Sequence, residues 1–253
     1  MSGERPPAGY EEFFVGNARV VALSALGMAI REAMSDCTMF EWAATSAGAR
    51  ALVGRGTAWA ATLPGGGAVV VRHSRHGGSL AALTSDLFLA PTRAPRELRT
   101  ALRLMRADVP TSEVVAYAIY PVLGPLARAD VATRLIDGAD FPEAWQASRT
   151  AEERLRLMQA LAKLLIRMQD AGAMHPDLNL KNVFISRNDQ ETTAYVLDVD
   201  RVEFLPPSGG PGARNLGRLL RSAQKLNRRY GLGMDFRTYL EPLLHAVSHK
   251  TPR

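Results

Sequence analysis

Two short polar motifs, joined by an apolar hairpin pattern, constrain this chain more than any other feature of its sequence. The first is His175-Pro176-Asp177, which follows an apolar helical pattern, and Asn182 comes five residues after the aspartate. Two apolar, β-rich runs separated by a polar turn come next. The second of these runs ends at Asp198, which begins the second motif.

Phosphoryl transfer requires side chains of these types. A carboxylate accepts the proton of the attacking hydroxyl, and an amide oxygen together with a second carboxylate holds magnesium on the nucleotide. The order aspartate, asparagine, aspartate at this spacing is typical of the catalytic and metal-binding loops of kinase-fold enzymes. A His-x-Asp motif alone is weak evidence, whereas the joined pattern, flanked by a helix and a hairpin, is much more specific.

Length and composition indicate a globular protein. The 253 residues suffice for one large domain or two lobes, and 47% of them are hydrophobic. The N-terminus lacks the basic-then-apolar pattern of a secretory signal, and the apolar stretch 18–30 is too short to span a bilayer. Cys37 is the only cysteine, which excludes an intrachain disulfide and a cysteine metal cage. We therefore expect a cytoplasmic protein.

The net charge of +6 rests almost entirely on arginine, because the first lysine of the chain is Lys163. Arginine enrichment is compatible with a GC-rich genome alone. A basic excess also favours anionic partners such as phosphorylated substrates, nucleic acid or acidic lipid surfaces.

The first half of the sequence predicts a β-rich region. We expect residues 1–16 to be poorly ordered, residues 19–34 to form an apolar helix, and residues 113–120 and 129–136 to form strands. A break in the pattern at Asp137-Gly138-Ala139-Asp140 marks the predicted boundary between an N-lobe, 1–137, and a C-lobe, 138–253.

A hairpin is predicted where two β-rich runs, 51–63 and 68–72, flank the turn Pro64-Gly65-Gly66-Gly67. Gly54 and Gly56 near its beginning fit two interpretations. They would let backbone amides approach nucleotide phosphates, or they form a plain tight turn.

A helix is predicted over residues 96–105, with Pro95 at its first position. Glu97 fits either a bridge to a cation on the third strand or an exposed first-turn glutamate that stabilises the helix dipole. The expected buried residues are Leu98, Ala101, Leu102 and Met105.

The second half is predicted to be mainly helical. A capping box, Thr150-Ala151-Glu152-Glu153, opens a helix that reaches about Asp170 and ends at Gly172. Its expected core residues are Leu155, Met158, Leu161, Ala162 and Leu165. The remaining predicted elements are the strands 183–186 and 192–197 and the helices 213–230 and 236–247.

Several motifs together resemble the lipopolysaccharide kinase family, and within it most closely the kinases of 3-deoxy-D-manno-octulosonic acid (Kdo). The resemblance covers about residues 54–226. The Arg-His-x-Arg-x-Gly-Gly run is the motif that best distinguishes this family from other small-molecule kinases. The matching residues are Gly54-Arg55-Gly56, Val71-Arg72-His73-x-Arg75-x-Gly77-Gly78, Arg96-Glu97, Arg128-Ala129-Asp130-x-x-Thr133-x-x-Ile136, His175-x-Asp177-Leu178-Asn179-x-x-Asn182 and Leu197-Asp198-x-Asp200.

The resemblance implies an α+β fold of the two-lobed protein-kinase-like type, with a β-rich N-lobe and a mainly helical C-lobe, that uses ATP and magnesium. Asp177 is then the base or the group that orients the sugar hydroxyl, and Asn182 and Asp198 hold magnesium. Glu97 pairs with the third-strand cation, and His175 braces the catalytic loop. For Asp200, a metal or substrate contact and a local turn cap fit equally well.

Two positions depart from the protein kinase pattern. Arg72 stands where a lysine normally grips the nucleotide phosphates, although arginine also binds phosphate bidentately. Pro176 replaces the catalytic-loop arginine that reads an activation-loop phosphate, and no Ala-Pro-Glu segment is present. The sequence therefore argues against a protein kinase switched by phosphorylation.

Three functions fit these residues. The first is an ATP-dependent kinase of a lipid-linked Kdo acceptor, the second an aminoglycoside-type phosphotransferase, and the third a catalytically weak nucleotide-binding protein. The intact set of Asp177, Asn182 and Asp198 favours an enzyme.

Helix 213–230 carries cations along one side and apolar residues along the other, without any acidic residue. The pattern fits an ordinary solvated surface helix or a contact with anionic lipid on the cytoplasmic face of the inner membrane. No nucleic-acid partner is expected. The aligned cations are Arg214, Arg218, Arg221, Lys225 and Arg228, and Arg229 lies close by.

Overall fold

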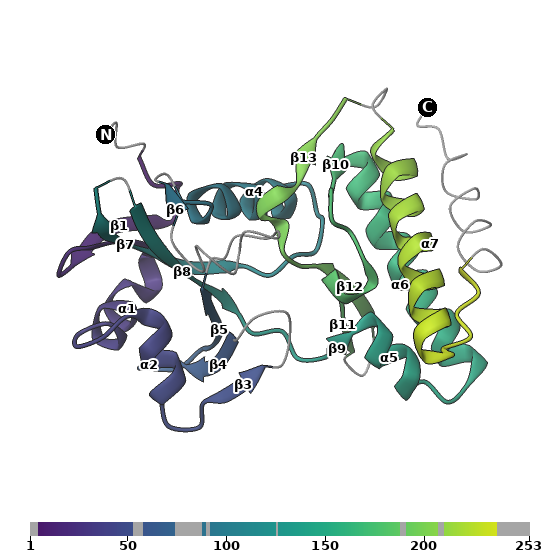
Figure 1. Ribbon diagram of the computed structural model, residues 1–253, viewed down its shortest axis with the longest axis horizontal. Coiled ribbons are helices and arrows are strands. Elements are labelled where there is room, and N and C mark those ends of the chain that lie inside the picture. The colour runs from purple at the N-terminus through teal and green to yellow at the C-terminus, as the bar shows by residue number, and fades with distance from the viewer. Residues whose placement is uncertain are drawn as a thin grey trace. The chain divides into compact units, whose positions relative to one another are not determined.

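The computed structural model describes residues 5–52, 58–73, 88–89, 92–124, 126–187, 191–206 and 210–236 (Figure 1). The chain divides into two compact units. One consists of Met1–Arg99 and Glu113–Leu135, and the other of Thr100–Ser112 and Ile136–Arg253. Both units combine sheet and helix, in agreement with the expected α+β class.

The first unit is built on an antiparallel sheet with the strand order β1-β2-β7-β8-β5-β4-β3 and with β6 paired to β8. The helices α1 (Gly27–Ala33) and α2 (Met39–Thr45) cover part of it, and α2 contacts β4, β5 and β8. The strands are β1 (Tyr10–Val15), β2 (Ala18–Leu23), β3 (Arg50–Leu52), β4 (Ala58–Thr62), β5 (Ala68–His73), β6 (Phe88–Leu89), β7 (Val114–Leu123) and β8 (Leu126–Arg134).

The predicted hairpin around the glycine cluster is confirmed, because Thr62 of β4 pairs with Ala68 of β5. Gly65, Gly66 and Gly67 all have positive φ. Glycine adopts this conformation without steric cost, which explains why three glycines follow each other in this turn.

Residues 10–23 correct two expectations. The segment expected to be disordered contains β1, and the predicted helix begins only at Gly27, because residues 18–23 form β2 in an antiparallel pair with β1. The tight turn at Gly16, which has a φ of 56°, makes this hairpin possible. An apolar run of this length fits a helix or a buried strand, and periodicity alone did not separate them.

The helix predicted after Pro95 is α4 (Ala94–Arg106). Leu98 and Ala101 are buried as expected, but Met105 is 39% exposed and Leu104 is fully buried instead. The covered side of the helix therefore follows residues 97, 101 and 104, one position away from the predicted stripe.

The second unit is organised around the 20-residue helix α6 (Ala151–Asp170), which packs on α5, α7, β10 and β12. The remaining elements are α5 (Phe141–Ala147), α7 (Pro211–Tyr230), the strands β9 (Ala139–Asp140), β10 (Ala173–Met174), β11 (Val183–Arg187), β12 (Thr192–Val196) and β13 (Glu203–Phe204), and the short 3-10 helices η2 (Leu180–Asn182) and η3 (Val199–Arg201). The predicted helix 236–247 lies outside the described residues beyond Phe236. No helix within the described ranges is long and apolar enough to cross a bilayer.

The capping box of α6 is formed as predicted, with the Thr150 hydroxyl accepting from the Glu153 amide at 3.1 Å. Four of the five expected core residues are buried, but Leu155 is 39% exposed. At 100° per residue Leu155 lies within about 20° of the buried Ala162, so it is on the predicted face, but it precedes Leu157, the first buried residue of the helix. The buried residues of the helix are Leu157, Met158, Ala160, Leu161, Ala162, Leu164, Leu165 and Met168.

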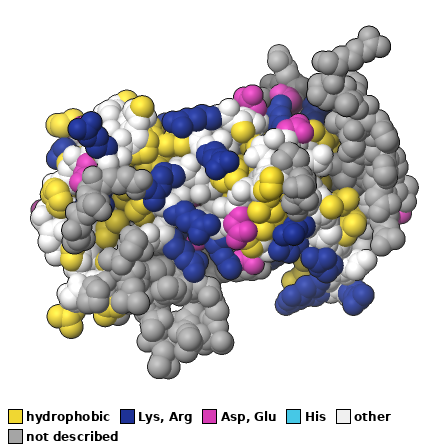
Figure 2. All heavy atoms as spheres, turned by 90° about the horizontal axis from the view of Figure 1, so that it is seen from above, with side chains coloured by type: hydrophobic (Ala, Val, Ile, Leu, Met, Phe, Trp, Pro, Cys, Tyr) yellow, Lys and Arg dark blue, Asp and Glu magenta, His cyan; other side chains and the backbone are white. Residues whose placement is uncertain are grey.

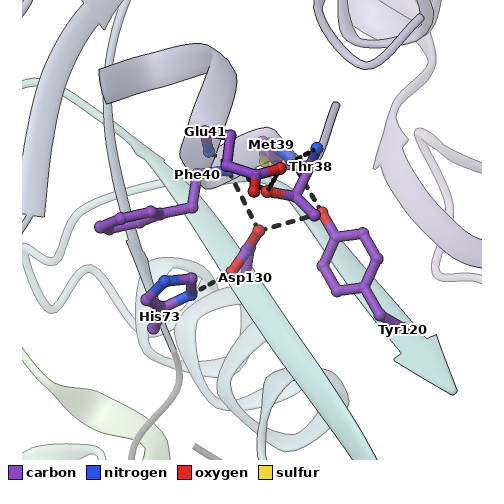
Figure 3. A network of polar contacts seen from close by, with 7 residues as sticks. All are labelled: Thr38, Met39, Phe40, Glu41, His73, Tyr120 and Asp130. Atoms are coloured by element: carbon purple, nitrogen blue, oxygen red, sulfur yellow. Dashed lines mark hydrogen bonds and ion pairs between the residues drawn. The ribbon is translucent and has the colours of Figure 1, made fainter. Parts of the chain in front are cut away.

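A buried carboxylate fastens α2 to the sheet of the first unit (Figure 3). Asp130 of β8 is 1% exposed; its Oδ1 accepts from His73 Nδ1 at 2.6 Å, and its Oδ2 accepts from the Tyr120 hydroxyl at 2.9 Å and the Phe40 amide at 3.1 Å. The Tyr120 oxygen in turn accepts from the Met39 amide at 2.9 Å. Burial and, second, the negative charge of Asp130 raise the pKa of Tyr120.

We expect Asp130→Ala to destabilise the first unit by about 3–5 kcal/mol, because it leaves three donors without their acceptor. The amides of Met39 and Phe40 should exchange with solvent hydrogen much faster, as measured by NMR. The control is Glu113→Ala, which breaks a partly exposed pair with Arg134 and should cost less than about 1 kcal/mol. Equal losses in the two variants would contradict a special role for the buried network.

Candidate active site

The hairpin β11–β12 brings Asn182 and Asp198 together. Val183 at the start of β11 pairs with Val196 at the end of β12, and the Leu197 amide donates to the Asn182 carbonyl at 2.8 Å. Because the two strands are antiparallel, the residue before β11 and the residues after β12 lie at the same end of the hairpin. The sequence motif thus places an amide and a carboxylate next to each other.

Asp177 lies in the loop between β10 and η2, which is held by its own polar side chains. The Asp177 carbonyl accepts from Asn179 Nδ2 at 2.9 Å and from Asn182 Nδ2 at 3.3 Å. The Asp177 amide donates to His175 Nδ1 at 3.2 Å. These bonds fix the backbone of the aspartate, while 48% of its side chain remains exposed.

His175 joins the loop of Asp177 to the residue that precedes Asp198. The ring is buried; Nδ1 accepts from the Asp177 amide, so Nε2 carries the hydrogen and donates to the Leu197 carbonyl at 3.3 Å. Burial is the main cause that lowers the pKa of His175, and it keeps the ring neutral. This geometry supports the bracing role that the family resemblance implies for His175.

Helix α7 contributes contacts that the sequence analysis missed. Asn215 is completely buried; its Oδ1 accepts from the His175 amide at 3.0 Å, and its Nδ2 donates to the Ala173 carbonyl at 2.8 Å. One turn later Arg218 Nε donates to the His175 carbonyl at 3.2 Å, and the Ser222 hydroxyl accepts from the Leu180 amide at 3.1 Å. The only signal in the sequence was a polar line at positions 215, 218 and 222, which share one helix face.

These contacts correct the expected basic face of α7. Arg218 is half-buried against the catalytic loop, whereas Arg214, Arg221, Lys225 and Arg228 are exposed. The apolar side is also less covered than expected, since Tyr230 is 50% exposed.

Asp198 has φ 60° and ψ 49°, which is the left-handed region of backbone conformation. Among the described residues, Asp108 is the only other residue besides glycine with positive φ. Side chains disfavour this conformation, and such residues gather at functional sites. It lets the chain turn sharply from β12 into η3.

Glu97 and Arg72 form an ion pair in the first unit, with Nη2 and Oε1 2.5 Å apart. Glu97 is 4% exposed, so it is not the solvated first-turn glutamate of the alternative interpretation. A buried carboxylate needs such a cation, because an unpaired charge is costly in the interior.

A further contact was not expected from the sequence. Arg201 of η3 pairs through Nη1 with Asp177 Oδ2, and both side chains are about half exposed. The candidate residues thus fall into two groups, Arg72 with Glu97 in the first unit and the surroundings of Asp177 in the second. Gly54 and Gly56 lie outside the described residues.

The antiparallel sheet of the first unit and the mainly helical second unit have the two-lobed protein-kinase-like fold. The fold agrees with the solved structure of WaaP in complex with acyl carrier protein, with a TM-score of 0.51 and 19% sequence identity over 87% of this chain and 90% of that chain. Residues 41–232 match the model of the lipopolysaccharide kinase (Kdo/WaaP) family, so the chain belongs to this family.

Two similar curated relatives carry the same name. The chain is 33% identical over 179 residues to a 3-deoxy-D-manno-octulosonic acid kinase of Stenotrophomonas maltophilia, which covers 68% of each chain. It is 30% identical over 189 residues to the protein of the same name in Vibrio parahaemolyticus, covering 73% of this chain and 76% of the relative. The family predicted from the sequence motifs is therefore confirmed.

Asn215→Ala should destabilise the second unit by about 2 kcal/mol or more, because two buried backbone groups lose their partners. We expect faster exchange of the His175 amide in NMR and a lower midpoint in thermal unfolding. Asn227→Ala is the matched control: Asn227 lies on the same helix and makes two similar bonds to the backbone of Met234. Asn227→Ala should leave exchange of the His175 amide unchanged. If Asn215→Ala also left this exchange unchanged, the bracing role of Asn215 would be wrong.

Proposed function

We propose that this chain transfers the γ-phosphoryl group of ATP to a hydroxyl of a Kdo sugar in the inner core of lipopolysaccharide. The observation that carries the proposal is that hydrogen bonds within one loop and one hairpin hold Asp177, Asn182 and Asp198 close together in the fold: the Asn182 side chain donates to the Asp177 carbonyl, and the Leu197 amide donates to the Asn182 carbonyl. The names of the curated relatives support the acceptor. The family supports the use of a nucleotide and a divalent metal.

Asp177 is the group we assign to the acceptor hydroxyl. Its backbone is fixed by three hydrogen bonds, and its carboxylate is accessible to a substrate once Arg201 has moved. A carboxylate in this position accepts the hydroxyl proton or orients the hydroxyl for attack.

Asn182 and Asp198 are the proposed magnesium ligands. The amide nitrogen of Asn182 donates to the Asp177 carbonyl, so its Oδ1 is the atom that suits a hard cation. Magnesium takes few protein ligands and completes its shell with phosphate oxygens and water, which fits one amide and one carboxylate. When bound, it would neutralise charge that develops on the transferred phosphoryl group.

Arg72 is the proposed grip on the nucleotide phosphates in the N-lobe, and Glu97 holds its guanidinium in place. Arginine keeps its charge and presents a planar fork of donors, so it can bind phosphate oxygens in place of the usual lysine. Backbone amides near Gly54 and Gly56 are assigned to the same phosphates.

Asp177→Asn should lower turnover by about 10²–10⁴-fold while nucleotide binding is retained, because only the proton acceptor is removed. Asp198→Ala should weaken binding of the magnesium-nucleotide complex itself. Transfer of labelled phosphate from ATP to a Kdo-lipid A acceptor measures the first effect, and calorimetry with a non-hydrolysable ATP analogue measures the second.

Asp170→Asn is the control for these variants, because it changes charge equally at an exposed position at the end of α6. It should leave both readouts unchanged. Full activity of Asp177→Asn would overturn the assignment of the catalytic loop.

We also assign the exposed cations of α7 to an anionic membrane surface on the cytoplasmic side of the inner membrane. Lys and Arg side chains outnumber acidic ones on the face shown in Figure 2. Each cation near acidic lipid contributes about 1 kcal/mol, so the exposed set supports peripheral binding by charge. This set consists of Arg214, Arg221, Lys225, Arg228 and Arg229.

The triple variant Arg221→Glu, Lys225→Glu, Arg228→Glu should abolish salt-sensitive sedimentation with vesicles that contain anionic lipid. Arg218 is left intact, because its bond to the His175 carbonyl links it to catalysis. Binding to neutral vesicles should be weak for every form of the protein.

The control reverses three exposed cations of α6, Arg156, Lys163 and Arg167, and changes the net charge by the same amount. It should preserve most of the vesicle binding. Equal loss in both triple variants would show that net charge rather than α7 determines the interaction.

A further inference from the structure

The ion pair between Arg201 and Asp177 conflicts with the proposed role of Asp177 as the group that accepts the proton of the acceptor hydroxyl. A group that receives the hydroxyl proton must present a carboxylate oxygen to the acceptor, yet Asp177 Oδ2 is paired with the Arg201 guanidinium. The pair also places a permanent positive charge where the acceptor hydroxyl must lie. A cation in this position would be stabilised by an anionic group of the substrate.

The pair is built so that it can open. Both side chains are about half exposed, and exposed ion pairs are weak because water screens them and because two flexible side chains must be ordered. Arg201 lies on the short helix η3, three residues after Asp198. A change of its side-chain rotamer therefore needs no rearrangement of the hairpin that carries the metal ligands.

We propose that Arg201 binds the carboxylate of an acidic sugar acceptor and leaves Asp177 when it does so. The inference rests on the proposed function, in which the acceptor is a sugar acid with a carboxylate and hydroxyls on one ring. Guanidinium binds carboxylates through two parallel hydrogen bonds, so an incoming acid can replace Asp177 as its partner. Arg201 thereby selects acidic over neutral sugars and exposes the base only when such an acceptor is bound.

The test compares Kdo-lipid A with the same acceptor whose Kdo carboxylate has been converted to a methyl ester. The wild-type enzyme should prefer the acid, and Arg201→Gln should raise KM for the acid roughly 10- to 100-fold. For the ester, turnover by the variant should exceed that of the wild type, because no guanidinium then covers Asp177, and the preference for the acid should disappear. Arg201→Lys should restore part of it, since the charge returns without the fork.

Arg156→Gln is the matched control, because Arg156 is an exposed arginine paired with Glu152 on α6. It should leave both KM values unchanged. Thermal midpoints of the variants should equal that of the wild type, since Arg201 is half exposed.

Two results would overturn the inference while leaving the proposed function intact. One is an unchanged preference for the acid in Arg201→Gln. The other is a raised KM for ATP with the preference retained, which would assign Arg201 to the nucleotide phosphates. A wild-type enzyme that does not phosphorylate the acid at all would overturn the proposed function and this inference together.

Discussion

The arrangement of the loop that carries Asp177 depends on the buried hydrogen bonds between Asn215 and the backbone on either side of Met174. One side chain satisfies the carbonyl of Ala173 and the amide of His175, in the manner of a neighbouring strand. The two ring nitrogens of His175 in turn form hydrogen bonds with the Asp177 amide and the Leu197 carbonyl, so these residues are also held in place. Buried polar groups are costly when they lose a partner, so these contacts permit few alternatives to the observed loop.

In the first unit, β5 carries two neighbouring polar side chains that are held from different elements. Arg72 is bound by Glu97 of α4, and His73 is bound by Asp130 of β8 and stacks on Phe40 at a ring distance of 3.7 Å. Successive side chains of a strand point to opposite faces of the sheet. A buried carboxylate on each side therefore fixes the end of β5, and this rigidity suits the phosphate-binding role proposed for Arg72.

Most of the structural features that could be predicted from the sequence depend on the spacing of residues that are close together in the chain. The loop with Asp177, the hairpin that leads to Asp198 and the capping box at Thr150 all depend on residues close together in the chain. Asn215 could not be found in this way, because its partners are about 40 residues away and a polar residue in an amphipathic helix has no distinctive pattern. The pairing of Arg201 with Asp177 likewise depends on how the loops fold back.

The errors in the elements have a related cause. Residues 18–23 form a strand rather than a helix because β2 pairs with β7 as well as with β1, and pairing with β7 depends on distant sequence. Leu155 and Met105 were assigned to buried stripes by periodicity, but the position of the neighbouring elements decides which side of a helix is covered.

The left-handed conformation of Asp198 has a consequence for how sequences of this kind can change. Glycine adopts this conformation freely, and aspartate tolerates it better than most residues with side chains. Replacement by glycine would therefore relax the backbone while it removes the carboxylate. Replacement by a bulky or β-branched residue would remove the carboxylate and also strain the backbone, so glycine, asparagine and aspartate suit this position best.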